Sequence, residues 1–449
     1  MSGVSRNIPL FVAFRVLFNA RFYYPVLGVL FLDLGLTLAQ YAMLNVVWAV
    51  TIVTLEIPSG ALADVIGRRR MVVMAAGLMV VELAIFSFAP TGNATVLFWL
   101  LVLNRVLSGA AEASASGADE ALAYDSLPED DRDRGWPKVL ESLTRWQSAA
   151  FFVAMVTGGA LYDAEFVGDV AGWLGLGWRP EAADVVRWPV WVTFAMAIGC
   201  LGVALSMREV SELGAAVGTG ERRSLRAMVA ESVANVWAGA KFVVGTRRVL
   251  LVLLAAVVCD SLVRLFMTFE SNFLRMIELP EVLFGVIGAG LALLGFVVAP
   301  VARAMVGGEG NGGRAVRNFA VVAGLVALAL VGAVFARPVW GVWVVIPIGV
   351  GFPMLSFFVS HYLNAWSDSR LRATVLSFRG VALNLAYGGA GLMFAALTGS
   401  LREENPAASE SQVFGAALVW LPVVFGVSAA ALVAFALASR GQTAKGRAA

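Results

Sequence analysis

Six arginines lie within long apolar runs of this 449-residue chain, where a charged side chain needs a partner or a polar cavity. They are Arg15, Arg21, Arg105, Arg145, Arg264 and Arg379. An unpaired guanidinium near the middle of a bilayer costs roughly 3 kcal/mol on insertion scales. Carboxylates in neighbouring runs could neutralise these arginines. An arginine that has no such partner could bind an anion, because its planar donor fork matches a carboxylate or a phosphate.

Two of these arginines stand four residues after an acid. The pairs are Asp260 with Arg264, and Glu141 with Arg145. Because this spacing is about one turn of an α-helix, each pair can form an ion pair on one helix face. For Glu141 and Arg145 we expect a plain interfacial salt bridge. For Asp260 and Arg264 two interpretations stay open: a permanent bridge that stabilises the helix, or an acid whose protonation releases the arginine.

Arg105 and two acids, Glu112 and Asp119, recur at intervals of seven residues. If they stand on one helix, they form a slowly drifting stripe. This stripe predicts a polar face that points into the interior of a helix bundle. Glu82 lies in another apolar run and has no place in this scheme.

The composition sets the class of the protein. Apolar residues make up 59% of the chain, charged residues only 14%, and the mean hydropathy is +0.81; these values indicate a polytopic membrane protein. A membrane-spanning helix needs about 20 apolar residues. Twelve runs qualify, at residues 8–32, 38–62, 71–91, 95–118, 139–161, 188–207, 249–273, 283–306, 318–336, 339–363, 372–398 and 414–438. The runs are continuously apolar, which predicts an all-α membrane protein of twelve transmembrane helices and not a β-barrel.

The chain is expected to form two halves. Residues 208–248 are the longest polar connection and separate six runs from six, which predicts one six-helix bundle at 1–207 and another at 249–449 with a short tail. Within the connection, apolar side chains at helical spacing among charges over 224–244 predict an amphipathic helix at the membrane surface. A similar Val-Leu cadence precedes Arg145 in one half and Arg379 in the other, as pseudo-symmetric halves would require.

Lysine and arginine are distributed unevenly among the connections. With the N-terminus placed inside, 22 of the 33 fall in cytoplasmic segments, five in outer loops and six within the runs. The positive-inside rule therefore predicts a multi-pass protein of the cytoplasmic (inner) membrane with both termini in the cytoplasm. The first run carries Arg15 and Arg21 and lacks a small-residue cleavage site, so we expect a retained helix and not a signal peptide.

A motif between the second and third runs carries a family resemblance. Residues 59–70 read Ser-Gly-Ala-Leu-Ala-Asp-Val-Ile-Gly-Arg-Arg-Arg. This segment resembles the loop between helices 2 and 3 of the major facilitator superfamily of membrane transporters, and its Glu-Ile-Pro lead-in at 56–58 resembles the prokaryotic, efflux-like branches. Asn104 to Gly109 resembles the family's Arg-x-x-x-Gly element. Gly158 and Gly159 lack the proline of the motif typical of antiporters.

The resemblance implies a major facilitator fold with two pseudo-symmetric halves, and it implies roles for particular residues. A charge network that holds the cytoplasmic side closed would contain the gating residues Gly60, Asp64, Gly67, Arg68, Arg69 and Asp125. Because helices 1, 4, 7 and 10 line the central cavity in this family, Arg15, Asn19, Arg105, His361 and Asn364 are candidates for substrate binding, and Asp260, Arg264 and Glu112 for proton coupling. If more than two of the cavity arginines are not neutralised, the substrate is expected to be an anion.

The sequence argues against an enzyme. It lacks a Gly-x-x-x-x-Gly-Lys-Ser/Thr loop, Gly-x-Ser-x-Gly, Cys-x-x-Cys and His-Glu-x-x-His, so neither ATP hydrolysis nor acyl, redox or zinc chemistry is indicated. We expect no metal and no cofactor, because the single histidine and two cysteines have no ligand spacing. Cys200 and Cys259 are expected to be buried packing residues.

The expected function is secondary active transport of a small organic solute, anionic or amphipathic, by alternating access and as proton-coupled efflux. The alternatives are a passive facilitator, an uptake symporter of the same fold, or a membrane sensor or assembly protein that does not transport. The expected partners are the small-molecule substrate, the coupling proton and membrane lipid. We expect a monomer and no binding of nucleic acid.

Overall fold

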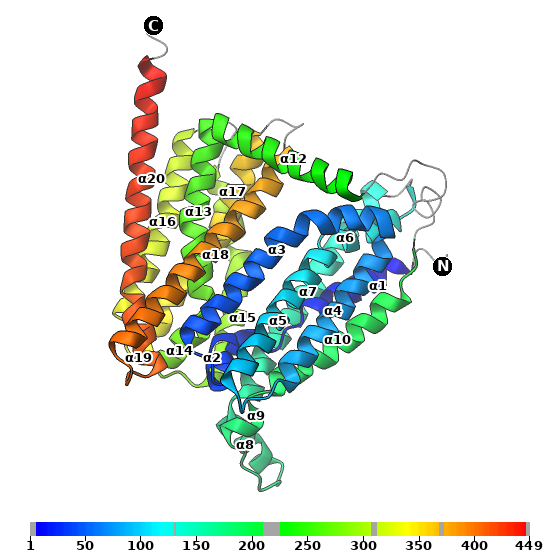
Figure 1. Cartoon of the computed structure of the whole chain (residues 1–449), viewed down its shortest axis with the longest axis vertical. Helices are drawn as coiled ribbons and strands as arrows, with labels where there is room; N and C mark the ends of the chain where they lie inside the picture. Colours follow the sequence, from blue (N-terminus) through cyan, green and yellow to red (C-terminus); the bar gives the residue numbers. More distant parts are fainter. Residues whose placement is uncertain (1–5, 130–131, 210–224, 307–311, 368–371, 446–449) are drawn as a thin grey trace. The chain divides into compact units, whose positions relative to one another are not determined.

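The computed structural model describes residues 6–129, 132–209, 225–306, 312–367 and 372–445. Within these ranges all regular secondary structure is helical (Figure 1). Eleven helices are long and apolar enough to cross a membrane, and the number is twelve if one bent helix pair counts as a span. The predicted all-α membrane fold is confirmed, and the predicted twelve spans match the upper count.

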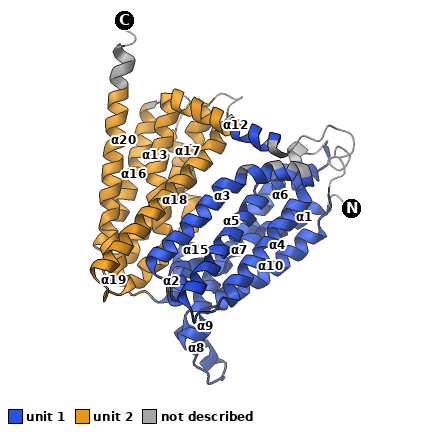
Figure 2. Ribbon diagram, viewed as in Figure 1, with its two compact units in different colours: residues 1–233, 280–289 blue, residues 234–279, 290–449 orange. Residues whose placement is uncertain are grey.

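Contacts within the chain divide it into two compact units (Figure 2). Unit 1 comprises residues 1–233 and 280–289, and unit 2 comprises residues 234–279 and 290–449. Each unit is described by itself below.

The described residues of the first part of the chain form eleven helical elements. In chain order they are α1 (Asn7–Asn19), η1 (Tyr24–Val26), α2 (Leu27–Asp33), α3 (Leu38–Ile66), α4 (Arg68–Phe88), α5 (Ala94–Ala115), α6 (Ala118–Asp125), α7 (Arg132–Tyr162), α8 (Ala164–Trp173), α9 (Ala182–Val185) and α10 (Trp188–Ser206). In Figure 1 they run from blue to green.

The second part begins with α12 (Leu225–Gly245), which corresponds to the amphipathic helix predicted at 224–244. The helical prediction is confirmed, and its location at the membrane surface stays a prediction. The elements that follow are α13 (Arg247–Thr268), α14 (Glu270–Met276), α15 (Glu281–Val306), α16 (Gly312–Val334), η3 (Trp340–Val344), α17 (Val345–Trp366), α18 (Arg372–Glu404), α19 (Glu410–Leu418) and α20 (Trp420–Lys445).

Side-chain caps fix where several helices start. The Thr37 hydroxyl accepts from Gln40 N, and the Gln40 side chain accepts from Thr37 N, so a capping box opens α3. Asn93 Oδ1 accepts from the backbone of Thr95 and Val96 at the start of α5. These bonds satisfy N–H groups that have no partner within the first turn of a helix.

The first predicted run, 8–32, is not one helix. Helix α1 ends at Asn19, a turn follows in which Arg21 N donates to Asn19 O over 2.9 Å, and η1 and α2 complete the span. The cause is burial of the Arg21 guanidinium, whose Nε donates to the Phe18 carbonyl over 3.1 Å. Because Pro25 stands at the start of η1 and has no N–H to donate, it also favours a new helical start.

The fourth run breaks as well. Helix α5 ends at Ala115, and Gly117 has a positive φ of +77° before α6 begins. Such a left-handed conformation suits glycine, which has no β-carbon. The predicted stripe of Arg105, Glu112 and Asp119 is therefore wrong for Asp119, which belongs to α6.

Other boundaries also differ from the predictions. Helix α7 begins seven residues before the predicted start at 139, and an 89° bend separates it from α8. The last run, 414–438, is divided between α19 and α20.

Within unit 1, α7 passes close to the turn after α1, since a β-carbon added to Gly158 would lie 1.7 Å from the Phe22 carbonyl oxygen.

Candidate functional site

A buried polar network connects three parts of unit 1. Arg21 Nη1 lies 2.7 Å from Glu82 Oε1, and Asn104 Nδ2 donates to Glu82 Oε2 over 2.7 Å. The Asn104 amide also bonds to the Glu82 carbonyl, and Arg21 Nη1 donates to the Tyr23 hydroxyl. None of Arg21, Glu82 and Asn104 is more than 5% exposed. Each charge has a partner, so this network holds the turn after α1 against α4 and α5.

Arg105, next to Asn104 on α5, is in the opposite situation. It is 7% exposed, and its Nε and Nη2 are buried without a hydrogen-bond partner among the described residues. Its Cζ lies 4.9 Å from the centre of the Phe31 ring, a cation–π contact that leaves the N–H groups unsatisfied. Buried polar groups nearly always have partners. Nε and Nη2 are adjacent donors that suit the two oxygens of one carboxylate or phosphate.

Glu112 is the acid nearest to Arg105 along α5, and it does not neutralise it. Seven residues separate the two, about 10 Å along a helix at 1.5 Å per residue. Glu112 is half-buried and has no hydrogen-bond or ion-pair partner within the part of the chain that the structure describes. One helix of unit 1 thus carries an unsatisfied arginine and an unpaired acid.

Arg15 on α1 has two acidic neighbours on α6. Its Nε lies 2.9 Å from Asp119 Oδ2, and its Nη2 donates to Glu120 Oε1 over 3.0 Å. The contact with Asp119 is close enough for an ion pair, but its geometry does not make a hydrogen bond. Arg15 is therefore neutralised within unit 1. The Asn19 amide, another substrate-binding candidate, donates to the Arg15 carbonyl over 2.8 Å.

The motif that follows the second span brings together two of its predicted gating residues. Arg68, the first residue of α4, forms an ion pair with Asp125 at the end of α6 and donates to the Ala121 carbonyl over 3.2 Å. The expected contact between Arg68 and Asp125 is present. Gly60 and Asp64 lie on α3, and the side chain of Asp64 is outside the described part of the structure.

In the same motif, Arg69 bonds to the end of α10 and Gly67 shapes the turn before α4. Arg69 donates to the carbonyls of Leu205 and Met207, which α10 leaves unpaired at its end, over 2.9 and 2.6 Å. A cation there also interacts favourably with the helix dipole. Gly67 has a φ of +98°, and a β-carbon added to it would lie 2.8 Å from Glu209 Oε2. The positive φ is the reason why the turn between α3 and α4 favours glycine, since the end of the Glu209 side chain is flexible and can move aside.

In unit 2, Asp260 and Arg264 form the predicted ion pair on α13. Arg264 Nε donates to Asp260 Oδ2 over 2.7 Å. Its other two nitrogens donate to Asn384 Oδ1 over 3.0 Å and to the Leu383 carbonyl over 2.8 Å, both on α18. The Tyr387 ring covers the guanidinium at 4.8 Å. Every nitrogen of Arg264 thus has an acceptor, in contrast to Arg105.

His361 and Asn364 lie one turn apart on α17. His361 stacks on Phe357 with 6.4 Å between ring centres and contacts Tyr362 edge-on. It has no hydrogen-bond partner among the described residues. The Asn364 amide donates to the Ser360 carbonyl of its own helix over 2.8 Å.

Arg145 and Arg379 are the two remaining arginines of the six that lie in apolar runs. Arg145 and Glu141 form the expected ion pair on α7, and their side chains are 72% and 69% exposed. Arg379 has no ion pair with any described residue. Four of the six arginines therefore have an acidic partner, at Asp119, Glu82, Glu141 and Asp260, and Arg105 and Arg379 do not. The condition of more than two free arginines is not met, so the argument for an anion rests on Arg105 in particular.

Sequence reasoning did not find the partners that lie far away in the chain. Asn104 and Asn384 each satisfy a charge more than 20 positions distant, and Glu82 pairs with Arg21 at a distance of 61 positions. No spacing rule predicts such pairs. The one available signal was that Glu82 and Arg21 are opposite charges in apolar spans, the third and the first.

Groups of three or more histidine, cysteine or acidic side chains that could hold a metal ion do not occur among the described residues. Cys200 and Cys259 are free and buried, as expected.

The sequence and the fold are similar to those of known membrane transporters. A family model described as the Major Facilitator Superfamily matches residues 10–391. The nucleoside transporter NupG has a similar structure, with 12% identity, a TM-score of 0.67, and coverage of 97% of this chain and 99% of that chain. A bacterial homologue of the human lysosomal transporter Spinster is 17% identical, with a TM-score of 0.62 and coverage of 96% and 94%.

A POT family transporter in complex with 5-aminolevulinic acid is 14% identical, with a TM-score of 0.61, and the match covers 93% of this chain and 95% of that chain. At these identities the likeness concerns the fold. Among curated proteins, none matches this sequence.

Proposed function

Since the chain belongs to the major facilitator superfamily and is a transporter and not an enzyme, we propose that it is a secondary transporter that carries a small organic anion across the membrane by alternating access. The anion carries a carboxylate or a phosphate, and Arg105 is the residue that binds it.

The unsatisfied guanidinium of Arg105 is the observation that carries this proposal. Nε and Nη2 are buried and have no acceptor, whereas Arg21 pairs with Glu82 and Arg264 bonds through all three of its nitrogens. A buried charge without a partner is strongly destabilising, so such a site favours a ligand of opposite charge. The ring of Phe31, which Arg105 contacts, would support the apolar part of an amphipathic substrate. The similar structure that holds 5-aminolevulinic acid is consistent with a carboxylate substrate.

Proton coupling belongs to the same proposal. Glu112 is the stronger candidate for the coupling acid, because it lies in a membrane span and has no partner among the described residues. Asp260 is the second candidate. Its arginine keeps two acceptors on α18 if the carboxylate is protonated, so the loss of Asp260 would not leave Arg264 without partners.

We also propose that Asp64, Arg68 and Asp125 stabilise the state that is closed on the cytoplasmic side, with Gly60, Gly67 and Arg69 shaping the turn. Export is the proposed direction, on the basis of the efflux-like motif at residues 56–70. Uptake with a proton and passive facilitation use the same site and differ only in coupling. His361 and Asn364 are proposed as substrate contacts from unit 2.

The experiment that tests the proposal uses purified protein in proteoliposomes and a panel of carboxylic acids and phosphate monoesters, each paired with its uncharged amide or alcohol. Thermal stabilisation identifies the anions that bind, and counterflow measures their transport. We expect stabilisation by acids and not by their neutral counterparts. Arg105→Gln should abolish both responses, and Arg105→Lys should weaken them, because lysine cannot form the two parallel bonds.

Arg145→Gln is the matched control, since it removes an arginine whose ion pair is exposed. It should leave binding and counterflow near the wild-type values. Equal stabilisation by acids and amides, or full transport by Arg105→Gln, would overturn the assignment of Arg105. Binding without any counterflow of the bound anion would instead favour the alternative of a sensor that kept the fold.

A further inference from the structure

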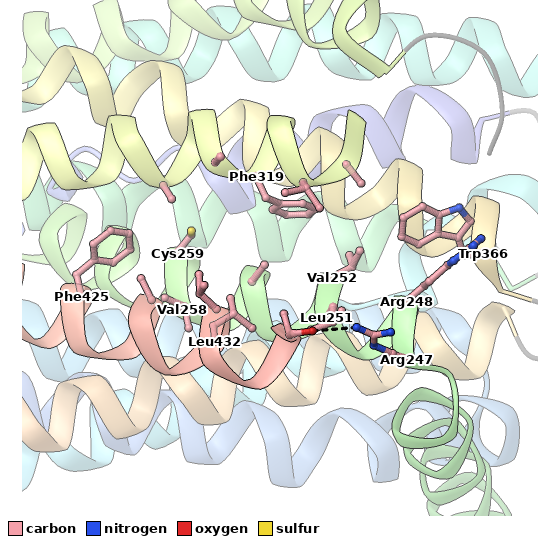
Figure 3. A pocket seen from close by; sticks show the side chains of 18 residues that line it. Arg247, Arg248, Leu251, Val252, Val258, Cys259, Phe319, Trp366, Phe425 and Leu432 are labelled. Atoms are coloured by element: carbon pink, nitrogen blue, oxygen red, sulfur yellow. Dashed lines mark hydrogen bonds between the residues drawn. The ribbon is translucent and has the colours of Figure 1, made fainter. Parts of the chain in front are cut away.

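Unit 2 contains a cavity of about 500 Å³ between α13, α16 and α20, with Trp366 at the end of α17 as a further wall. It lies apart from the Asp260–Arg264 pair, which bonds to α18. Figure 3 shows its elongated outline: Trp366, Arg247 and Arg248 lie at one end, and Phe425 lies at the other.

The cavity exists because small side chains line it. Fourteen of its eighteen lining residues have hydrocarbon side chains, and six of these are alanines: Ala255, Ala315, Ala320, Ala323, Ala429 and Ala436. Protein interiors are otherwise close-packed. An apolar space of this kind does not hold water well, since water needs polar partners there. The chemistry of the walls therefore calls for a hydrocarbon chain.

Two arginines, Arg247 and Arg248, lie at one end of the cavity. Arg247 Nε donates to Ser439 Oγ and Nη2 donates to the Ala436 carbonyl, each over 2.9 Å, so this guanidinium is tied to α20. Arg248 is exposed and has no hydrogen-bond or ion-pair partner among the described residues. In Figure 3 its side chain lies beside Trp366. The occupant that complements both ends has a hydrocarbon chain and an anionic headgroup.

The position of the cavity in the bundle indicates where such an occupant comes from. The span that contains α20 is the least buried of the eleven candidate spans among the described residues, so the cavity borders a helix that is open to the bilayer. Tryptophan and arginine are typical of the membrane–water interface, and basic residues there attract anionic lipids. By the positive-inside rule, the start of α13 is also expected on the cytoplasmic side.

We propose that this cavity binds one anionic phospholipid of the bilayer, with an acyl chain between α13, α16 and α20 and the phosphate at Arg248. This site is separate from the substrate site at Arg105 and does not depend on the proposed transport function.

The test measures which lipids the protein retains. Native mass spectrometry of the protein released from nanodiscs of phosphatidylcholine and phosphatidylglycerol gives the number and identity of bound lipids, and we expect one phosphatidylglycerol to be retained in preference to phosphatidylcholine. Arg248→Gln should lower its affinity about fivefold, the loss of one basic residue's contribution of about 1 kcal/mol. Ala429→Phe should remove the lipid by filling the cavity.

Two matched controls separate the site from general effects. Arg303→Gln removes another exposed arginine of unit 2, at the end of α15, and Ala430→Phe places the same ring on the next, exposed residue of α20. Both should retain the lipid. Unchanged retention in Arg248→Gln and Ala429→Phe, or equal retention of both phospholipids, would overturn the proposal. Displacement of the lipid by inorganic phosphate alone would overturn it too, because it would assign the site to a free anion.

Discussion

Arg21 Nη1 and Glu82 Oε1 lie 2.7 Å apart inside unit 1, and neither side chain is more than 5% exposed. The pair joins the turn after α1 to α4. The uncharged Asn104 of α5 orients the carboxylate by donating to its second oxygen. Two opposite charges that looked unrelated in the sequence are thus one structural element.

Loss of one member of this pair should destabilise the protein strongly. Glu82→Gln leaves the buried Arg21 charge uncompensated, a situation that costs about 3–5 kcal/mol. A lowered thermal unfolding midpoint in detergent measures the effect. Glu141→Gln removes the acid of the exposed pair, for which 0–1 kcal/mol is usual, and should change the midpoint little. The double change Arg21→Met with Glu82→Leu should recover part of the loss, and no recovery would contradict the electrostatic explanation.

Gly158 should tolerate no side chain. Gly158→Ala would place a β-carbon 1.7 Å from the Phe22 carbonyl oxygen, so the backbone of α7 or of the turn must move. Overpacking of this kind costs about 1–3 kcal/mol, and occasionally more. Gly77→Ala is the control, because this glycine of α4 has no heavy atom within 4 Å of the added carbon and alanine favours a helix. Equal thermal midpoints for the two variants would show that the close crossing is absent in solution.

The contact between Arg68 and Asp125 can be tested by exchange. Asp125→Asn and Arg68→Gln should each reduce transport in proteoliposomes, because the α4–α6 ion pair is lost. The swapped protein, with Arg68→Asp and Asp125→Arg, should regain part of the rate if the pair acts through its charges. Arg69→Gln should instead lower stability, since Arg69 bonds to the end of α10. A swapped protein no better than the single variants would leave only a topological role for Arg68.

The coupling acid can be identified by measuring accumulation driven by a pH gradient and downhill exchange in the same variants. Under the coupling hypothesis, Glu112→Gln should lose accumulation driven by a pH gradient and keep downhill exchange, because a permanently neutral side chain cannot carry the proton. Asp260→Asn keeps the α18 bonds of Arg264 and should affect accumulation less. The opposite outcome, with accumulation lost only in Asp260→Asn, would move the coupling site to α13 and support the release of Arg264.

The orientation predicted from the distribution of lysine and arginine can be measured by labelling. A single cysteine at Leu176, which is 64% exposed between α8 and α9, should react with an impermeant maleimide from outside the cell. One at the exposed Lys241 of α12 should react only after the membrane is opened. Cys200 and Cys259 are buried and give the background. Labelling of Lys241→Cys from outside would reverse the topology.

The sequence predicted the parts of the structure that local rules govern. Hydropathy located the spans, and the four-residue spacing of Asp260 and Arg264 predicted their ion pair correctly. Breaks within spans escaped prediction, because hydropathy averages over a window and does not detect the turn at Arg21 or the left-handed Gly117. The partners of Arg264 on α18 escaped as well, since they depend on how helices pack and not on spacing along one helix.

Gly117 shows how the position of a charged side chain can depend on the backbone conformation of a nearby residue. A β-carbon added there would have no heavy atom within 4 Å, so crowding would not reject alanine. The left-handed backbone would reject it, and this backbone is what takes Asp119 off α5 and places it, with Glu120, against Arg15. The residue at position 117 therefore influences the charge environment of α1 through its backbone conformation alone.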